Sequence, residues 1–254
     1  MKKPVVCIGV GEIAGVFARG LLRTGHPLIP VTRDMDMANV AKEVAEPLAV
    51  IVAVAEKDID HVLTDIPQGW RDRLILLQNE LLPNDWQRHG IENPTVISVW
   101  FEKKPGQDFK VLIPSPVYGP HAQLVVDALT ALGIPSRRLG TEKELLQELV
   151  LKNVYILTTN ICGLETGGTV SELWQQHEKI ARTVADEVMD LQAWLTQQPL
   201  DREQLIAGML KAFDGDPEHK CMGRSAPARL ERALKVADEA GLMVSKLREI
   251  HAQA

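Results

Sequence analysis

PVVCIGVGEIAGVFARGLLRTGHPLIPVTR, residues 4–33, decides the fold of this chain. An apolar run at residues 5–8 is followed by GVGEIA at 9–14, by an apolar helical stretch that ends near Gly25, and by a second apolar run at 28–31. The glycine turn fits the G-x-G-x-x-G/A pattern of dinucleotide-binding units, with alanine in the third small position. The strand before it and the helix and strand after it make a plain packing turn the weaker interpretation.

Each residue of the turn has a separate expected role in holding a cofactor. Gly9 permits the tight turn, Gly11 lets the backbone approach a pyrophosphate, and Ala14 lets the helix lie close to the strand. The backbone N–H groups of Glu12 and Ile13 lie in the first turn of the helix, and the positive end of the helix dipole faces the anion there. The Glu12 carboxylate would repel a pyrophosphate, so we expect it to point to solvent or to weaken binding.

The end of the second strand distinguishes NADP from NAD. Thr32 and Arg33 stand there, and a guanidinium and a hydroxyl suit the 2′-phosphate of NADP. An NAD site instead places a carboxylate at this point, and Asp34 is a candidate for that role. We expect NADP as the cofactor, with NAD as the alternative and a solvated surface role for Arg33 left open.

Composition excludes several classes of protein. A net charge of −6 with no long basic run, and only 4% aromatic residues, argue against nucleic acid as a partner. No segment reaches the length of a membrane span, and the N-terminal apolar run lacks a signal-peptide cleavage pattern. Three widely separated cysteines suit reduced thiols. We therefore expect a cytoplasmic protein without a membrane partner.

Strand and helix signals alternate up to about residue 140 and then become almost purely helical. Apolar runs predict strands at 48–54, 74–77, 95–100 and 109–113, and periodic stretches predict helices at 57–65, 121–132, 142–163, 169–197, 201–213 and 226–250. We expect an α/β fold with an N-terminal Rossmann-type, doubly wound parallel sheet in residues 1–140. A smaller all-helical domain for substrate binding or dimerisation would occupy residues 141–254.

Three polar residues are candidates for the chemistry. Asn79 follows an expected strand, where ligands bind in such sheets, although a turn residue satisfying its own backbone fits equally well. Lys152 lies in an apolar helical stretch and could protonate a carbonyl oxygen; the alternative is an ammonium that snorkels to water. Asn160 lies about two turns further along the same helix, within reach of one cleft, and its amide needs a partner in substrate or in a helix carbonyl.

These residues resemble the ketopantoate reductase family, within the wider 6-phosphogluconate dehydrogenase-like group. Residues 9–15 are similar to the phosphate loop of the family, residues 32–33 to its NADP-selecting strand end, and residues 76–79 to its Leu-x-Asn-Gly segment. Lys152 and Asn160 are similar to its catalytic lysine helix. The resemblance implies that Lys152 is the general acid, that Asn79 helps to hold cofactor and substrate, and that Asn160 supports the site.

The chain departs from the family pattern in its substrate half. Ile156 stands where the family has an asparagine, and Glu80 replaces the glycine after Asn79. The family's C-terminal glutamate has no equivalent, because its register falls near Ser225. Ser225 and Arg224 are therefore expected to bind substrate. Arg229 is a second candidate for a carboxylate, or one member of a charged helix face with Glu231 and Arg232.

The expected function is reduction of a small 2-oxo acid, with hydride from NADPH and a proton from Lys152. The alternative is a nucleotide-binding sensor or scaffold that has lost the substrate site, which Glu12, Ile156 and the missing glutamate favour. We expect no metal site, because His219 and Cys221 have no companion pair of ligands. The amphipathic stretch at 169–197 would pack on other helices or form a homodimer through the helical domain.

Overall fold

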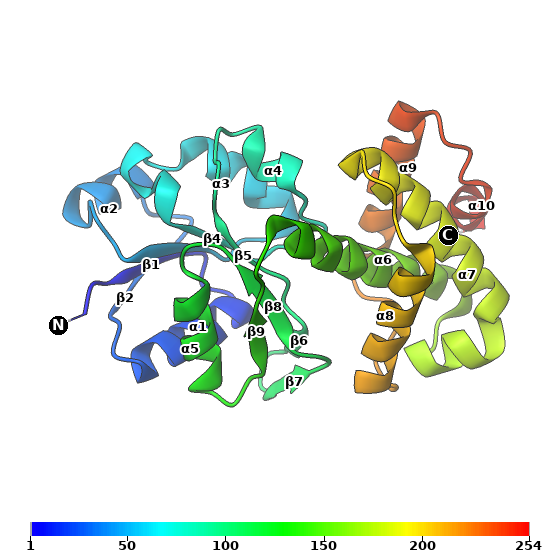
Figure 1. Ribbon diagram of the computed structural model, residues 1–254, viewed down its shortest axis with the longest axis horizontal. Coiled ribbons are helices and arrows are strands. Elements are labelled where there is room, and N and C mark those ends of the chain that lie inside the picture. Colours follow the sequence, from blue (N-terminus) through cyan, green and yellow to red (C-terminus); the bar gives the residue numbers. More distant parts are fainter. Residues whose placement is uncertain (1, 254) are drawn as a thin grey trace. The chain divides into compact units, whose positions relative to one another are not determined.

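The computed structural model describes residues 2–253, and the chain divides after Leu149 into an α/β unit and a helical unit (Figure 1). The expected fold class, a largely parallel sheet followed by a helical region, is confirmed. The long helix α6 (Glu142–Thr166) begins close to the predicted boundary at 140, and its first two turns are grouped with the α/β unit. A domain limit at residue 140 stays a prediction.

A seven-stranded sheet in the order β2-β1-β3-β4-β5-β8-β9 forms the centre of the α/β unit. Its strands are β1 (Val5–Ile8), β2 (Leu28–Val31), β3 (Ala49–Val52), β4 (Leu74–Leu76), β5 (Thr95–Ile97), β8 (Ser115–Tyr118) and β9 (Ser136–Arg138). β1 pairs in parallel with both β2 and β3, so the strand order changes direction at β1. Sheets of this kind bind ligands beyond the carboxyl ends of the strands at that point.

One edge of the sheet departs from the expected parallel pattern. β8 pairs antiparallel with β5, and the run predicted as a strand at 109–113 forms β7 (Phe109–Val111) outside the main sheet. β7 pairs antiparallel with β6 (Phe101–Lys103) as a separate hairpin. Parallel neighbours are joined by a crossover, usually a helix, whereas the chain between β5 and β8 forms the β6–β7 hairpin instead.

Helices cover both faces of the sheet. Figure 1 shows α1 (Glu12–Arg23) and α5 (Ala122–Thr130) on one face and α2 (Met37–Glu43), α3 (Ile59–Asp65) and α4 (Pro83–Gln87) on the other. Short 3-10 turns, η1 (Glu56–Asp58) and η2 (Gln68–Arg73), precede α3 and β4. Every residue of β1 and β3 is buried as a result, which explains why their sequences are continuous apolar runs.

α1 and α5 meet at a helix crossing with no space for a side chain. A Cβ atom on Gly20 would lie 2.2 Å from the carbonyl oxygen of Ala128, so only glycine fits. Phe17 and Leu21 of α1 join Leu129 of α5 in the core beside this contact. The crossing therefore holds α1, whose first turn follows the glycine turn, close against its neighbour.

The helical unit contains the rest of α6 and four further helices. They are α7 (Val170–Thr196), α8 (Arg202–Gly215), α9 (Ala226–Ala240) and α10 (Ser245–Gln253). The prediction of one helix at 226–250 is wrong, because Gly241 takes a φ of +67° and ends α9 in the left-handed conformation. The Glu187 carboxylate of α7 accepts the N–H groups of Lys246 and Leu247 at 2.8 and 2.9 Å and caps α10.

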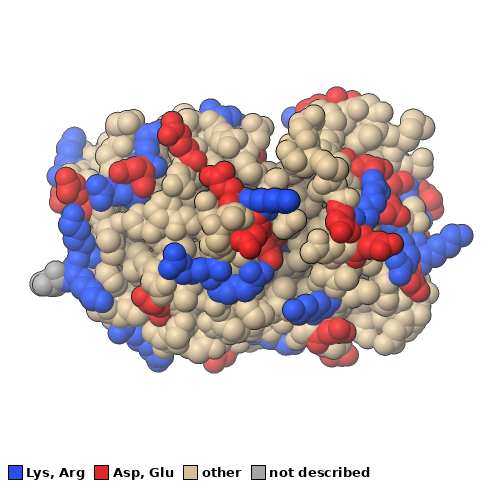
Figure 2. Space-filling model, viewed as in Figure 1, with Lys and Arg blue, Asp and Glu red and all other residues tan. Residues whose placement is uncertain are grey.

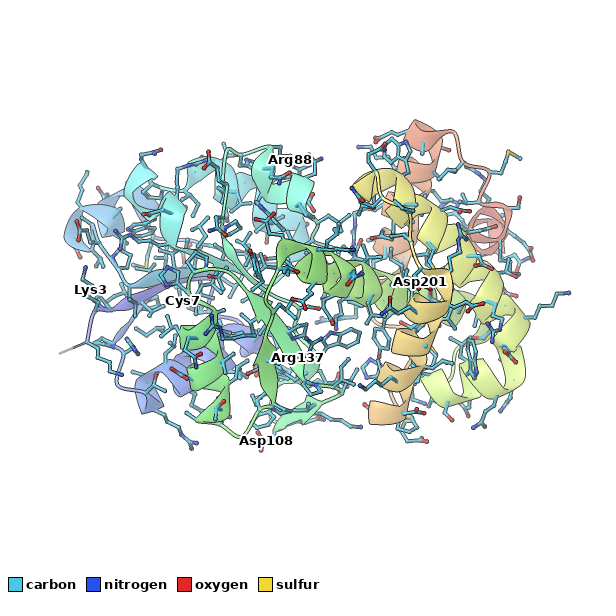
Figure 3. The ribbon with its side chains drawn as sticks, viewed as in Figure 1. Lys3, Cys7, Arg88, Asp108, Arg137 and Asp201 are labelled. Atoms are coloured by element: carbon cyan, nitrogen blue, oxygen red, sulfur yellow. The ribbon has the colours of Figure 1, made fainter. Side chains whose placement is uncertain are left out.

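Side-chain caps also set where α7 and α8 begin. Thr169 and Glu172 form a reciprocal capping box at the start of α7. At the start of α8 the carboxylate of Asp201, labelled in Figure 3, accepts the N–H of Gln204 at 3.0 Å. Such caps satisfy backbone donors that a helix leaves unpaired at its first turn. Both helices begin within one residue of the positions predicted from sequence.

The apolar character of the helices and the charge of the surface bear on what the protein can contact. Among the described residues, no helix combines the length and the apolar character needed to cross a membrane. The chain has a net charge of −6, and Figure 2 shows basic and acidic side chains interspersed on the face drawn.

Candidate functional site

The glycine turn between β1 and α1 has the geometry that a phosphate loop requires. Gly9 has a φ of +91°, and a Cβ there would lie 2.5 Å from the carbonyl oxygen of Ala53. A Cβ on Gly11 would meet no atom within 4 Å, so this glycine faces open space at the start of α1. Ala14 is 3% exposed and packs in the core, while Ile13 is half-buried. The turn therefore fits a pyrophosphate approaching Gly11 and the first N–H groups of α1.

A cavity of about 1110 Å³ opens beside this turn, at the carboxyl ends of β1, β2 and β3. Residues 8–11, 31–33 and 53–55 line it from the three strands, and residues 35–38 line it from the start of α2. One face of η1 and α3 completes the wall with Asp58, His61, Val62 and Asp65. The cavity lies where the strand order changes direction, which is the expected place for a dinucleotide in this kind of sheet.

The side of the cavity at the end of β2 contains both predicted cofactor-selecting residues. Thr32 and Arg33 line it, and the largely exposed Arg33 guanidinium donates to Asp58 at 3.2 Å. Asp34 is exposed and is not among the residues that line the cavity. Asp36 lines it, but its carboxylate accepts the N–H of Ala38 at 2.9 Å and caps α2. The guanidinium is thus better placed for a ligand than Asp34.

Glu12 neither points freely to solvent nor turns inward. Its carboxylate accepts a hydrogen bond from the Lys103 ammonium of β6 at 2.9 Å. The negative charge in the first turn of α1 is therefore paired, which weakens the repulsion expected from sequence.

The turn after β4 keeps a glycine-like backbone without a glycine. Gln78 is buried; its Nε2 donates to the carbonyl oxygens of Val52 at 2.7 Å and Val54 at 3.3 Å. The half-buried Asn79 follows at the carboxyl end of β4, and Glu80 has a φ of +61°. A non-glycine residue in this region is strained by about 1–2 kcal/mol. The position that departs from the family pattern thus retains the backbone shape that glycine favours.

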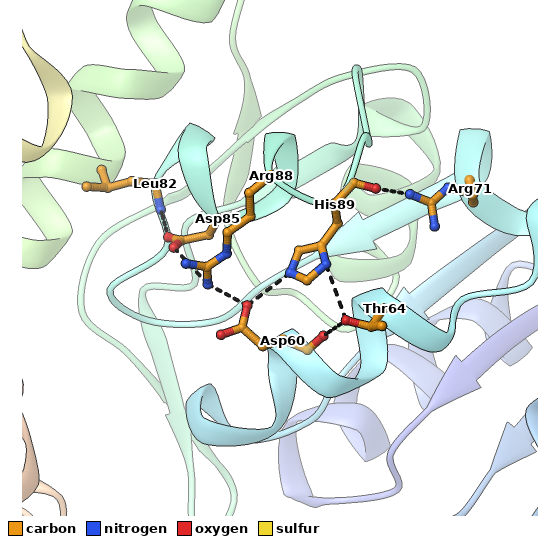
Figure 4. A network of polar contacts seen from close by, with 7 residues as sticks. All are labelled: Asp60, Thr64, Arg71, Leu82, Asp85, Arg88 and His89. Carbon is orange, nitrogen blue, oxygen red and sulfur yellow. Dashed lines mark hydrogen bonds and ion pairs between the residues drawn. The ribbon is translucent and has the colours of Figure 1, made fainter.

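A polar network fixes the helix that forms one wall of the cavity (Figure 4). Asp60 of α3 accepts hydrogen bonds from His89 Nε2 at 3.0 Å and from Arg88, while Thr64 Oγ1 lies 3.4 Å from His89 Nδ1. Arg71 donates to the backbone oxygen of His89. The hydrogen bond from His89, followed by that from Arg88, lowers the pKa of Asp60. One face of α3 therefore lines the cavity while the other is held by charge-assisted hydrogen bonds.

In the helical unit, Lys152 of α6 is half-buried and lies over the ring of Tyr155, with Nζ 5.6 Å from the ring centroid. Burial, followed by the positive charge of Arg229, lowers its pKa to about 7. A lysine in this state exchanges a proton readily near neutral pH. The choice between a catalytic ammonium and one that snorkels to water stays a prediction.

Asn160 connects α6 to α9. Its side-chain oxygen accepts a hydrogen bond from the Arg229 guanidinium at 2.9 Å, and its Nδ2 donates to the backbone oxygen of Cys221 at 3.1 Å. Arg229 is only 8% exposed, whereas Glu231 and Arg232 are exposed, so Arg229 does not belong to a charged surface face. The amide that needed a partner thus orients a buried guanidinium near Lys152.

The other predicted substrate-binding residues, unlike Arg229, are exposed to solvent. Ser225 precedes α9 and makes no capping hydrogen bond, and both it and Arg224 are exposed. Ile156 is 7% exposed, and the neighbouring Asn153 points elsewhere, donating to Gln192 of α7 at 2.9 Å.

Comparison with solved structures identifies proteins of the same fold. A 2-dehydropantoate 2-reductase from Methylococcus capsulatus superposes with a TM-score of 0.71 at 14% identity, covering 98% of this chain and 95% of that one. A PanE/ApbA family ketopantoate reductase from Ralstonia eutropha JMP134 gives 0.70 at 14%, covering 98% and 96%. The chain has the ketopantoate reductase fold. A D-mandelate dehydrogenase solved with NADH and anilino(oxo)acetate gives 0.65 at 13%, again covering 98% and 96%.

Sequence comparisons add nothing to this likeness. No protein-family model matches the chain, and no curated protein matches it in sequence. The fold implied by the resemblance is confirmed by the solved structures, at 13–14% sequence identity.

Four residues that line the cavity and the lysine that pairs with Glu12 were not predicted. Asp58, His61, Val62 and Asp65 follow the spacing i, i+3, i+4 and i+7, so helical periodicity alone could have placed them on one face. Lys103 gave no such signal, because 91 residues separate it from its partner Glu12.

Proposed function

We propose that the protein is a divergent ketopantoate reductase-like enzyme of the cytoplasm that reduces a small 2-oxo acid with NADPH. The bound cofactor supplies hydride to the carbonyl carbon. The glycine turn and the adjoining cavity support this assignment, because they provide an open approach for pyrophosphate and a wall for the adenosine half. Residues of the helical unit supply the rest of the chemistry.

Lys152 is the general acid, and its environment is the observation that carries the proposal. Its ammonium donates a proton to the carbonyl oxygen as that oxygen gains charge, and the neutral amine then recovers a proton from water. The pKa of about 7 makes this transfer easier than it would be from an ordinary lysine. Because the acid form is required, the rate of reduction falls as pH rises above about 7.

Arg229 binds the substrate carboxylate, with Ser225 and Arg224 as further contacts at the start of α9. A guanidinium suits a planar carboxylate, and that of Arg229 is already oriented by Asn160 at 2.9 Å. Arg224, being exposed, has no comparable support. Asn79 at the end of β4 holds the substrate and the nicotinamide ribose.

NADPH is preferred over NADH because Arg33 binds the 2′-phosphate, with Thr32 donating a further hydrogen bond. The Arg33 side chain is largely exposed, and among the described residues its guanidinium pairs with Asp58 alone. Arg33→Ala should weaken NADPH binding by about tenfold or more, as expected for loss of a charge-assisted contact, and leave NADH binding nearly unchanged. Equal weakening of NADPH and NADH binding would contradict this role of Arg33, and tighter binding of NADH than of NADPH by the wild type would favour NAD.

The test of the function is a titration with NADPH and NADH followed by nicotinamide fluorescence, then turnover with a panel of 2-oxo acids. We expect NADPH to bind and at least one acid to be reduced. Lys152→Ala should abolish turnover while NADPH still binds. Binding without turnover on every acid would favour the alternative, a cofactor-binding sensor or scaffold, for which the apolar Ile156 beside the lysine is the supporting observation.

We further propose a homodimer formed through the helical unit. Trp194 and Leu195 at the end of α7 are 36% and 37% exposed, and large apolar side chains together at a surface favour a protein contact. One solved structure of the same fold, from Staphylococcus aureus, is of a dimeric ketopantoate reductase. Sedimentation velocity of the wild type and of Trp194→Lys tests this, and a monomeric wild type would exclude it.

A further inference from the structure

The first turn of α1 carries a negative charge at a place where the proposed function requires an anion. Glu12 follows Gly11 directly, and Gly11 lines the cavity. The helix dipole stabilises a carboxylate in the first turn, but the same carboxylate opposes the negative charge of a pyrophosphate. A cofactor can bind well here only if something offsets Glu12.

Lys103 provides that offset. Its ammonium donates to Glu12 Oε2 at 2.9 Å and to the backbone oxygen of Lys104 at 2.8 Å. Its side chain is 16% exposed, against 42% for Glu12, so the charge is held beside the helix rather than in free solvent. An ammonium has three N–H donors, and the third remains for an incoming oxygen once these two acceptors are counted within the described part of the chain.

The position of Lys103 is built by packing. β6 lies against α1, where the ring of Phe101 is 6.3 Å from that of Phe17, both in the core. Two residues further along, Lys103 reaches the start of the same helix, while pairing with Phe109 of β7 keeps the strand extended. The hairpin thus places one lysine at the phosphate end of α1.

Stability alone explains this arrangement poorly. Ion pairs exposed to this degree contribute about 0–1 kcal/mol to the free energy of unfolding. Without the pair of Lys103 and Glu12, the hairpin would still pack on α1 through Phe101. The same charge beside a helix N-terminus has a larger effect on an anion, because lysine, helix dipole and backbone N–H groups act together on it.

We propose that Lys103 is a cofactor-binding residue, which neutralises Glu12 and donates to the pyrophosphate of the dinucleotide at the start of α1. This rests on the proposed function in requiring NADPH at the glycine turn, with its 2′-phosphate at Arg33. It assigns a binding role to the β6–β7 hairpin, which lies outside the strand–turn–helix unit that the sequence motif describes.

The test compares NADPH with 2′-AMP, which has the adenosine 2′-phosphate but no pyrophosphate. Lys103→Met should weaken NADPH binding by about tenfold, from the loss of a charge-assisted hydrogen bond and the exposure of Glu12, and leave 2′-AMP binding unchanged. Glu12→Gln should tighten NADPH binding a few-fold, and the double variant should recover part of the loss. Lys104→Met is the matched control, since that lysine pairs with Glu102 at 3.1 Å and is 59% exposed; it should bind NADPH normally.

Three results overturn the proposal. NADPH binding by Lys103→Met within twofold of wild type does so, and so does an equal weakening of NADPH and 2′-AMP, which would indicate a general disturbance of the unit. A wild type that binds neither ligand overturns the proposed function together with this inference. Thermal unfolding of each variant shows whether the fold is intact.

Discussion

The two units of the molecule position their candidate functional residues by different means. In the α/β unit the decisive features belong to the backbone: the turn at Gly9, the open face of Gly11 and the strand ends around the cavity. In the helical unit they are ionisable and amide side chains with restricted access to water, above all Lys152, Asn160 and Arg229. Backbone shape depends on local sequence, whereas the burial of such side chains depends on tertiary packing, and this difference explains which candidate residues the sequence reveals.

The largest effect should come from filling the helix crossing in the α/β unit. Gly20→Ala would place a methyl group 2.2 Å from the Ala128 oxygen and should lower the free energy of unfolding by about 3 kcal/mol, as overpacking does. Gly15→Ala on the same helix meets no atom within 4 Å and should gain up to about 1 kcal/mol of helix propensity. Urea unfolding measures both, and similar values for the two would show that backbone contact at Gly20 matters little.

Removing the charge of Lys152 in the helical unit should raise the free energy of unfolding, which is opposite in sign to the effect of Gly20→Ala. Unfolded lysine titrates near pH 10.4, while folded Lys152 has a pKa of about 7, so the unfolded chain binds more protons between these values and stability rises with pH across that window. Lys152→Met should therefore raise the unfolding free energy by about 2 kcal/mol at pH 6, after allowance for residual solvent contact, and this gain should vanish above about pH 10.

Lys179→Met, at an exposed position of α7, is the control for the lysine prediction and should change the unfolding free energy little at any pH. Unfolding curves at pH 6, 8 and 10 distinguish the cases. A Lys152→Met variant that is less stable than wild type at pH 6 would mean that the ammonium is stabilised by its surroundings, and the contrast between the units would weaken.

A smaller gain in the free energy of unfolding is expected at Glu80, where the α/β unit has the backbone conformation of a glycine without a glycine. Glu80→Gly relieves the strain of a φ of +61° but adds entropy to the unfolded chain, so the net gain should be about 0.8 kcal/mol. The denaturant midpoint measures it. A loss of stability instead would show that the Glu80 side chain contributes more than its backbone strain removes.

The smallest effect should come from surface charge in the α/β unit. Asp60→Asn should lower the unfolding free energy by about 0.5 kcal/mol at pH 7, because exposed pairs contribute little. The pKa of Asp60 is lowered in the folded state, so its contribution is present above the unfolded pKa near 4 and is lost as pH falls through the folded value. Asp65→Asn is the control, because the partner of Asp65, His61, is exposed. If both variants unfold at the same acid pH, the network around Asp60 does not contribute to stability.

The sequence predicted the α/β unit in detail where the signals are local. The unit at residues 4–33 needs only an apolar run, two glycines and a periodic helix, and it forms as expected. The β6–β7 hairpin and the antiparallel β8 were not predicted, because strand pairing depends on chain connection as well as on apolar runs. Gly241 also ended a helix that periodicity alone extended to residue 250.

The helical half of the site was only partly predictable. Lys152 and Asn160 were singled out because polar residues in an apolar stretch need an explanation, whereas Arg229 lies among charged neighbours and looked equally suited to a surface. Its burial depends on how α9 packs, which periodicity does not determine. The roles assigned to these residues stay predictions until the variants are measured.

Gln78 has a consequence for hydration at the edge of the sheet. Carbonyl oxygens at the end of a strand and just beyond it, when the sheet leaves them unpaired, ordinarily accept hydrogen bonds from water. Here one buried amide serves both Val52 and Val54, so a group attached to the chain takes the place that exchanging water molecules would hold. The strand end that presents Asn79 is thereby anchored from inside the protein, and its position does not depend on the arrival or departure of solvent.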